Sequence, residues 1–263
     1  MISQSIKLYC GTAILFALNC SGTAVAQNES ADEIMNKVMA AQKWDHVIQD
    51  LELHIQKAKS EQNLNLQTQI RVENGSIYSF TTFTAPQKVQ NTKVLLIDHP
   101  TEQDELWLYL PALKKVTKLA DSNKDRAFMG SDFQFADLVI TSTTQQYTLI
   151  EENEQAWIIQ VNDPAQNQYS KWIQTISKDN LMPTQIDYFD NKEEPLKTLT
   201  IESFWTVENQ FFPKKSTMTN LQSHSKTELL VHSVDLTTDV PLSLFSEAGL
   251  VGEISPQKDE HAQ

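Results

Sequence analysis

Apolar and polar residues alternate with a period of two over most of this chain, and no other feature constrains its fold as strongly. Val47, Leu51, Leu53 and Ile55 alternate with polar residues, and a second run covers 64–72. Asn74-Gly75 follows, which favours a two-residue hairpin turn. Similar runs occupy residues 77–83, 147–151, 157–161, 169–176, 185–189, 196–207, 211–221 and 229–236. About a dozen short strands at hairpin spacing predict an antiparallel meander or barrel. The pattern argues against a parallel sheet, in which strands and helices alternate along the chain.

Two segments depart from this alternation. Ser30 and Glu33 form a capping box, and the spacing of the apolar residues after them predicts a helix from Ala31 to Gln42. The pattern also predicts a short second helix over 135–139, with Ser131 and Asp132 as its caps. We expect one large sheet to wrap around the first helix, because an amphipathic helix must bury its apolar face.

The first 26 residues read as a cleaved signal peptide. Lys7 precedes the short apolar run 8–20, and Ala24-Val25-Ala26 provides a cleavage site. The alternative is a buried N-terminal helix. Cleavage would remove both cysteines, Cys10 and Cys20, and with them any thiol chemistry. We therefore expect a secreted protein with a signal peptide at 1–26, one domain at 27–251 and a flexible tail at 252–263.

Charge and spacing exclude several functions. The net charge is −13, which argues against nucleic-acid binding because phosphate neutralisation supplies most of that affinity. The six histidines do not form the helical zinc motif, and the sequence has no glycine loop for phosphate. We expect no cofactor, no metal and no enzymatic activity. An envelope esterase stays open as an alternative, since triads are recognised by geometry and not by spacing.

The middle third of the chain has a different pattern. Residues 106–110 are apolar on both faces, which indicates a strand covered on both sides or in contact with a ligand. A basic cluster follows, which is either a solvated rim or a docking patch for an acidic partner or lipid head group. Its members are Lys114, Lys115, Lys118, Lys124 and Arg126.

The run from Glu105 to Leu138 resembles the signature of the outer-membrane lipoprotein-sorting family, the LolA-like periplasmic lipoprotein carriers. The matching residues are Trp107, Tyr109, Pro111, Phe128, Gly130, Ser131, Asp132, Phe133, Asp137 and Leu138. The resemblance implies a mainly β fold: a half-open antiparallel β-barrel of about 11–13 strands, with the N-terminal helix and a short second helical segment as a lid. It implies an apolar cavity and transport of acylated cargo, and it supplies no catalytic residues.

We therefore expect a monomeric carrier in the periplasm of a Gram-negative bacterium, which takes the acyl chains of a lipoprotein or lipid between the inner and outer membranes with transient membrane contact. An inner-membrane transporter of the resistance-nodulation-division (RND) type is a partner by resemblance. The alternative is a lipid-sensing module that acts with such a transporter. The expected cavity lining is Leu51, Leu53, Ile55, Leu64, Leu66, Ile70, Trp157, Ile159, Leu199, Ile201 and Trp205, with Met35 and Met39 from the lid.

Overall fold

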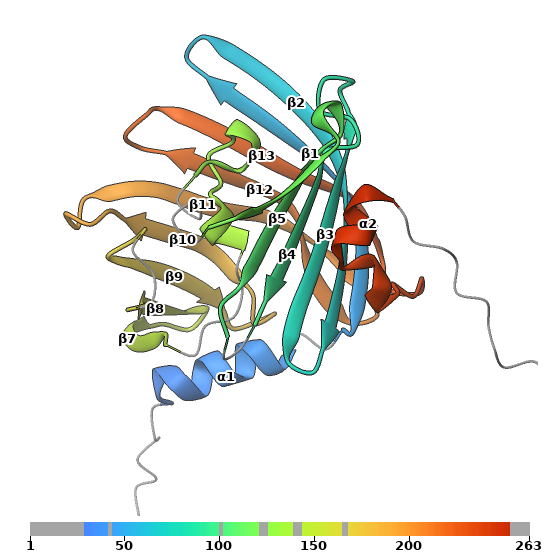
Figure 1. Ribbon diagram of the computed structural model, residues 1–263. Helices are drawn as coiled ribbons and strands as arrows, with labels where there is room; N and C mark the ends of the chain where they lie inside the picture. The colour runs from blue at the N-terminus through green and yellow to red at the C-terminus, as the bar shows by residue number, and fades with distance from the viewer. Residues whose placement is uncertain are drawn as a thin grey trace, which may run out of the picture.

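The computed structural model describes residues 29–41, 44–99, 102–120, 126–138, 144–164 and 168–252. The expected signal peptide, Lys124 and all of the expected tail except Gly252 lie outside these ranges. Thirteen strands form one antiparallel sheet (Figure 1). They are β1 (His46–Lys57), β2 (Ser60–Glu73), β3 (Ser76–Ala85), β4 (Lys93–Asp98), β5 (Glu105–Leu110), β6 (Lys115–Leu119), β7 (Gln146–Glu152), β8 (Ala156–Asn162), β9 (Lys171–Ser177), β10 (Pro183–Phe189), β11 (Pro195–Val207), β12 (Gln210–Asn220) and β13 (Ser225–Asp235).

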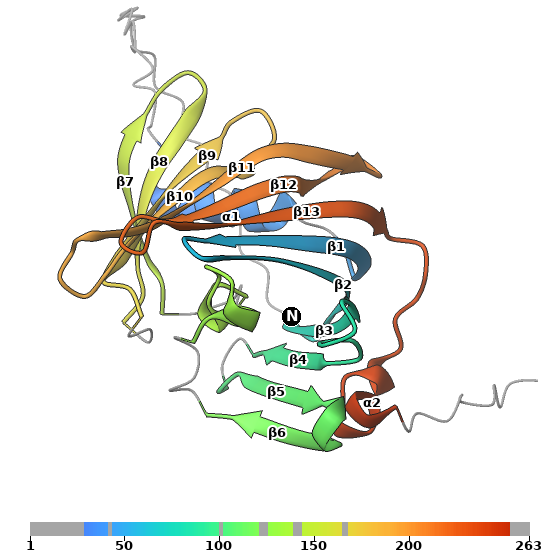
Figure 2. The ribbon, with the colours of Figure 1, turned by 90° about the horizontal axis from the view of Figure 1, so that it is seen from above.

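The strand order is that of a meander in two halves. Strands β1 to β6 follow one another to one edge, β7 to β13 run from the other edge inward, and β1 pairs with β13 in the middle. In the described ranges, the edge strands β6 and β7 are not paired with each other. The sheet is therefore curved but not closed, which confirms the expected half-open antiparallel architecture (Figure 2).

The hairpin turns follow the sequence signals. Asn74 and Gly75 have φ angles of 51° and 81° and connect the facing pair Glu73 and Ser76. Both central residues of a type I′ turn need positive φ, which glycine and asparagine adopt with little strain. The turn between β11 and β12 has the same character at Glu208 and Asn209.

Strand register places the alternating apolar residues on one face of the sheet. Leu53 lies opposite Leu64 on β2 and opposite Leu229 on β13. Leu66, two residues along β2, lies opposite Phe83 on β3. The concave face of the sheet is thus apolar across its central strands, as period-two alternation requires.

Helix α1 (Ala31–Ala41) covers one end of the concave face. The Ser30 N–H donates to Glu33 Oε2 at 2.8 Å and the Glu33 N–H donates to Ser30 Oγ at 3.3 Å, which confirms the capping box. The buried face of the helix packs against Trp157, Ile159, Val161 and Ile176 of β8 and β9. The helix starts where it was predicted, and Gln42 lies outside the described residues.

Residues 126–138, which belong to the connection between β6 and β7, lie inside the curve of the sheet (Figure 2, light green). We call them the crossover segment. It contains two short 3-10 helices, η3 (Phe128–Gly130) and η4 (Phe135–Leu138). Phe128, Phe133 and Phe135 are buried in the main cluster of the concave face. The sequence predicted the second helical segment but not its position inside the sheet.

The C-terminal segment covers the convex face, which the sequence did not predict. It contains η5 (Leu242–Leu244) and α2 (Glu247–Val251), and it buries Val240, Phe245 and Leu250 against Phe80 and Leu95. Strand β5 is covered on both sides: Leu106 faces the concave cluster, while Trp107 packs against the convex one. Among the described residues, no helix combines the length and apolar character that crossing a membrane requires.

Candidate functional site

The concave face contains most of the expected cavity lining. Leu51, Leu53, Ile55, Leu64 and Leu66 are buried in its main cluster. Leu199 and Trp205 are half-buried against the same cluster, and Ile201 is buried on β11.

The remaining members of the expected set lie toward the end that α1 covers or outside both clusters. Met35, Trp157 and Ile159 belong to the cluster under α1. Ile70 is half-buried opposite the buried Val47. Met39 is 54% exposed and is not part of either concave cluster. The expected residues therefore do not surround a single point but extend along the curved sheet.

Several apolar side chains on the concave face keep part of their surface accessible. Trp172, Ile186, Leu199, Trp205, Leu229 and Val234 all pack on the main cluster without being buried. Neither α1 nor the crossover segment covers them fully. This partly covered apolar surface is the first component of the candidate site.

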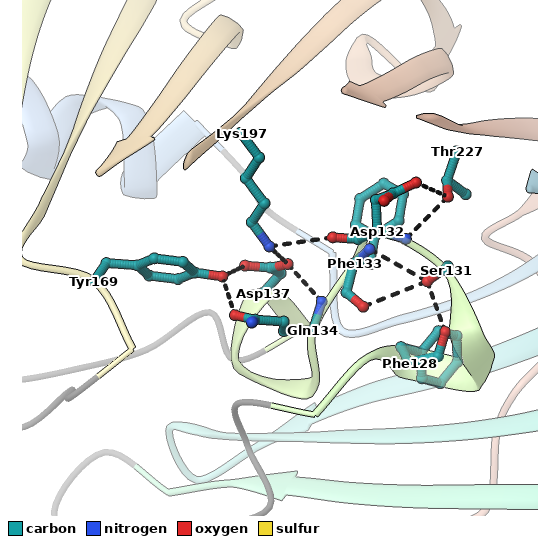
Figure 3. A network of polar contacts seen from close by, with 9 residues as sticks. All are labelled: Phe128, Ser131, Asp132, Phe133, Gln134, Asp137, Tyr169, Lys197 and Thr227. Carbon is teal, nitrogen blue, oxygen red and sulfur yellow. Dashed lines mark hydrogen bonds and ion pairs between the residues drawn. The ribbon is translucent and has the colours of Figure 1, made fainter. Parts of the chain in front are cut away.

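A buried polar network is the second component (Figure 3). Lys197 Nζ lies 2.6 Å from Asp137 Oδ2, and both side chains are only 2% exposed. The Tyr169 hydroxyl donates to Asp137 Oδ1 at 2.7 Å, and the side-chain oxygen of Gln134 lies within hydrogen-bonding distance of the same hydroxyl. Lys197 Nζ also lies 5.1 Å and 5.2 Å from the ring centres of Tyr169 and Tyr188. The ammonium is thus surrounded by one carboxylate and two aromatic rings.

Asp132 forms a second connection between the crossover segment and the sheet. Its carboxylate accepts hydrogen bonds from the hydroxyls of Ser225 and Thr227 on β13, the latter at 2.7 Å. Its N–H donates to Thr227 Oγ1 at 2.9 Å, and its carbonyl accepts from Lys197 Nζ at 3.3 Å. Asp132 of the sequence motif therefore connects this segment to β11 and β13.

The environment shifts the pKa values of this network. Burial lowers the pKa of Lys197, while the charge of Asp137 opposes that shift. Burial, and then the charge of Asp137, raise the pKa of Tyr169 and of Tyr188. Both phenols therefore stay protonated, and that of Tyr169 acts as a hydrogen-bond donor.

The motif residues have structural roles that differ from the predicted caps. Ser131 Oγ donates to the Phe128 carbonyl at 2.6 Å and accepts from the Phe133 N–H at 3.2 Å. The Gln134 N–H is instead bonded to Asp137 Oδ2 at 2.7 Å, so the prediction that Ser131 and Asp132 cap the second helix was wrong. Gly130 has a φ of 82°, a conformation that suits glycine at this turn. These hydrogen bonds of Ser131 are all within this turn, and none of them joins it to a histidine, as the serine of an esterase triad would require.

Sequence reasoning missed Lys197, Tyr169, Ser225 and Thr227. A usable signal existed, because Lys197 has the same strand parity as Leu199 and Ile201. Thr227 likewise has the parity of Leu229 and Val231. A polar residue at an inward position of an apolar strand indicates a buried partner. Within the described part of the chain, no three His, Cys, Asp or Glu side chains come together as a metal site requires.

Three members of the basic cluster, Lys114, Lys115 and Lys118, lie in the turn after β5 and on the edge strand β6, and Arg126 begins the crossover segment. Lys114, Lys115, Lys118 and Arg126 are exposed. Lys118 Nζ is 2.8 Å from Glu105 Oε2 and lies over the ring of Trp107, with 4.9 Å between the nitrogen and the ring centre. Pro111 begins the turn η1 (Pro111–Leu113), which precedes Lys114, and Tyr109 packs on the convex cluster.

A small pocket of about 190 Å³ lies beside Ala41 at the C-terminal end of α1, next to the β9–β10 and β11–β12 turns. Leu181, Met182 and Phe211 give it an apolar side, and Asn180 and Asn209 give it a polar one. None of its lining residues belongs to the expected cavity.

Comparison with known proteins identifies the fold. A family model described only as an uncharacterized protein matches residues 75–251. A crystal structure from Vibrio parahaemolyticus, described as an outer membrane lipoprotein-sorting protein domain, has 25% identity and a TM-score of 0.80, with coverage of 83% of this chain and 97% of that chain. A DUF1329 family protein from Desulfovibrio piger has 20% identity and a TM-score of 0.79, covering 82% and 96%. A LolA superfamily protein from Nitrosomonas europaea has 16% identity and a TM-score of 0.67, covering 84% and 99%. No curated protein matches the chain.

Proposed function

Because the chain belongs to the family of uncharacterized proteins whose model matches residues 75–251, and has the fold of lipoprotein-sorting and LolA superfamily proteins, we propose that it is a periplasmic carrier of acylated molecules. The cargo is the acyl chain of a lipoprotein or a lipid. The similar structure from Vibrio parahaemolyticus supports this cargo class, because its description names lipoprotein sorting.

The observation that carries the proposal is the partly covered apolar surface on the concave face. Leu199, Trp205 and Leu229 are half-buried although they point to the inside of the curved sheet. A closed interior would cover more of these side chains, because protein interiors are close-packed. A guest molecule with apolar chains would complete this packing.

The energetics favour such a guest. Exposing an acyl chain of about fourteen CH₂ groups to water costs on the order of 11 kcal/mol, at about 0.8 kcal/mol per group. Burial on the concave face offsets much of this cost. Release then requires an acceptor that binds the cargo more tightly than the carrier does, since equal affinities would not drive transfer from one to the other.

Export and partners complete the proposal. The signal-like residues 1–26 direct the protein to the periplasm, where it exchanges cargo between the inner and outer membranes. We assign the exposed residues of the basic cluster to contact with the donor or acceptor, an inner-membrane transporter being one candidate. The strongly negative net charge opposes lasting adhesion to anionic membranes.

Binding of a neutral apolar probe tests the proposal. N-phenyl-1-naphthylamine fluoresces when it enters an apolar site, and we expect saturable binding to the protein. Leu199→Glu should weaken this binding by about tenfold or more, because it places a charge in the apolar site. Thr200→Glu is the matched control, since Thr200 is exposed on the opposite face of the same strand.

Two outcomes would contradict the carrier. One is the absence of saturable probe binding to the wild-type protein. The other is an equal effect of both substitutions, which would place the probe outside the concave face. Circular dichroism of each variant separates loss of binding from loss of folding.

A further inference from the structure

In the hydrogen bonds described above between the sheet and the crossover segment, the sheet mainly supplies the donors and the segment mainly supplies the acceptors. On the sheet side stand hydrogen-bond donors: Lys197 of β11, Ser225 and Thr227 of β13, and Tyr169 just before β9. On the segment side stand acceptors, above all the carboxylates of Asp132 and Asp137. A bond in the opposite direction runs from the Asp132 N–H to Thr227 Oγ1.

The apolar contacts of the crossover segment are arranged in a similar way. Phe128, Phe133 and Phe135 are buried among the leucines of the concave face. The Phe128 ring lies 5.8 Å from that of Phe83 on β3 and 5.4 Å from that of Phe135. One short segment thus supplies the sheet with both an apolar group and an anionic group.

An acylated molecule with an acidic head group has this same combination of parts. We propose that the crossover segment is a built-in substitute ligand, and that its phenylalanines and Asp137 occupy the site where the concave face binds an acyl chain and an anionic group. Lys197 and Tyr169 are then the residues that recognise the carboxylate or phosphate of the cargo. This inference rests on the proposed carrier function.

Exchange of the crossover segment for cargo is energetically reasonable. A buried ion pair contributes little net stability, so replacing Asp137 by another anion on Lys197 changes little. Burying one phenylalanine corresponds to burying about two to four methylene groups. A chain of about fourteen methylene groups therefore offers at least as much apolar burial as the three phenylalanines.

Dodecyl phosphate and dodecyl maltoside test this inference, because they share a chain and differ in charge. The two variants to compare are Asp137→Asn and the double variant Lys197→Met with Asp137→Asn. Neither has the competing carboxylate, and only the first keeps the cation. The double variant has no unpaired buried charge from this pair, which protects its folding.

We expect Asp137→Asn to bind dodecyl phosphate more tightly than the wild type does. The double variant should bind it about tenfold or more weakly than Asp137→Asn, since a hydrogen bond to a charged group is lost. Dodecyl maltoside should bind both variants within about twofold, because it makes no contact with the cation. Isothermal titration calorimetry below the critical micelle concentration measures each of these affinities.

Equal affinity of the two variants for dodecyl phosphate would overturn the inference, while maltoside binding would leave the carrier function standing. Inorganic phosphate that binds Asp137→Asn as tightly as dodecyl phosphate does would also overturn it, because the site would then recognise a free anion. Failure of the wild type to bind dodecyl maltoside would count against the carrier itself.

Discussion

The pair of Lys197 and Asp137 is the most unusual feature of this protein at the scale of single residues. Both side chains are 2% exposed, and the ammonium makes a second contact with the Asp132 carbonyl. Removing two charges from water costs several kcal/mol per ion, which the attraction between them must repay. We therefore expect this pair to position the crossover segment more than to stabilise the fold.

Breaking the pair should cost more than removing it. We expect Lys197→Met to lower the free energy of unfolding by about 3–5 kcal/mol, because Asp137 is left as a buried, unpaired charge. Adding Asp137→Asn should recover much of that loss. Urea denaturation of the three proteins measures the coupling, and two additive losses would show that the residues do not act as a pair.

The sequence reveals only half of this pair. Asp137 belongs to the motif that resembles lipoprotein-sorting proteins, but its partner lies 60 positions later in the chain. The parity of Leu199 and Ile201 places Lys197 on the inner face, yet parity cannot show which carboxylate it meets. That contact depends on the path of the crossover segment, which no local pattern encodes.

At the scale of elements, the sequence predicts those features that neighbouring residues determine, such as turns and helix caps. It predicts poorly those features that depend on packing between distant segments. The Asn74-Gly75 turn and the Ser30–Glu33 capping box could be predicted because a few neighbouring residues fix them. The C-terminal segment on the convex face could not, since its contacts with Phe80 and Leu95 are far away in sequence. The cavity lining was predicted as a list of apolar residues, and the sequence could not say which of them stay partly accessible.

The capping box gives a prediction for α1. Hydrogen bonds from the Ser30 N–H and hydroxyl lower the pKa of Glu33. Ser30→Ala should speed amide exchange at Ile34 and Val38 by about fivefold at neutral pH, because an N-cap is lost. A carboxyl group whose pKa is lowered by folding stabilises the folded state at pH values above its ordinary pKa. This stabilisation is lost as the pH falls. The difference should therefore shrink in acid, and unchanged amides in β3 serve as the internal control.

The crossover segment gives a second prediction at this scale. Asp132 and Thr227 contact each other, with 2.9 Å between the Asp132 nitrogen and Thr227 Oγ1. Changing both to cysteine allows a disulfide to fix the segment to β13. In the oxidised protein, dodecyl phosphate should bind about tenfold or more weakly, because the competent state is no longer populated.

Reduction of that disulfide should restore binding in the same protein sample. The mature chain would offer no other thiol, since Cys10 and Cys20 lie in the expected signal peptide. Equal affinity of the oxidised and reduced forms would mean that the cargo site does not overlap the segment.

At the scale of the whole molecule, the sheet separates the apolar clusters of its two faces. The crossover segment packs into the main concave cluster and α1 covers the second, while the C-terminal segment covers the convex cluster. The central pairing of β1 with β13 joins strands from opposite ends of the domain. We expect such distant pairing to slow folding, because the entropy of closing a long loop is lost before the strand contacts that compensate for it can form.

Two phenylalanines, one on each side of the sheet, test this separation. Phe245 is 6% exposed on the convex side, 5.5 Å from the ring of Tyr78. Phe133 is 8% exposed on the concave side, within the crossover segment. Each change to alanine should lower the free energy of unfolding by about 3–5 kcal/mol, through lost burial and the cavity left behind. Urea denaturation should therefore not distinguish the two variants.

Binding of dodecyl phosphate should distinguish them. Phe245→Ala should leave the affinity within about twofold, because distant sites act independently. Phe133→Ala should raise it by about tenfold or more, since it weakens the substitute ligand that competes with the cargo. If Phe133→Ala instead lowered the affinity, Phe133 would be part of the wall that holds the acyl chain, and the crossover segment would stay in place while cargo binds beside it.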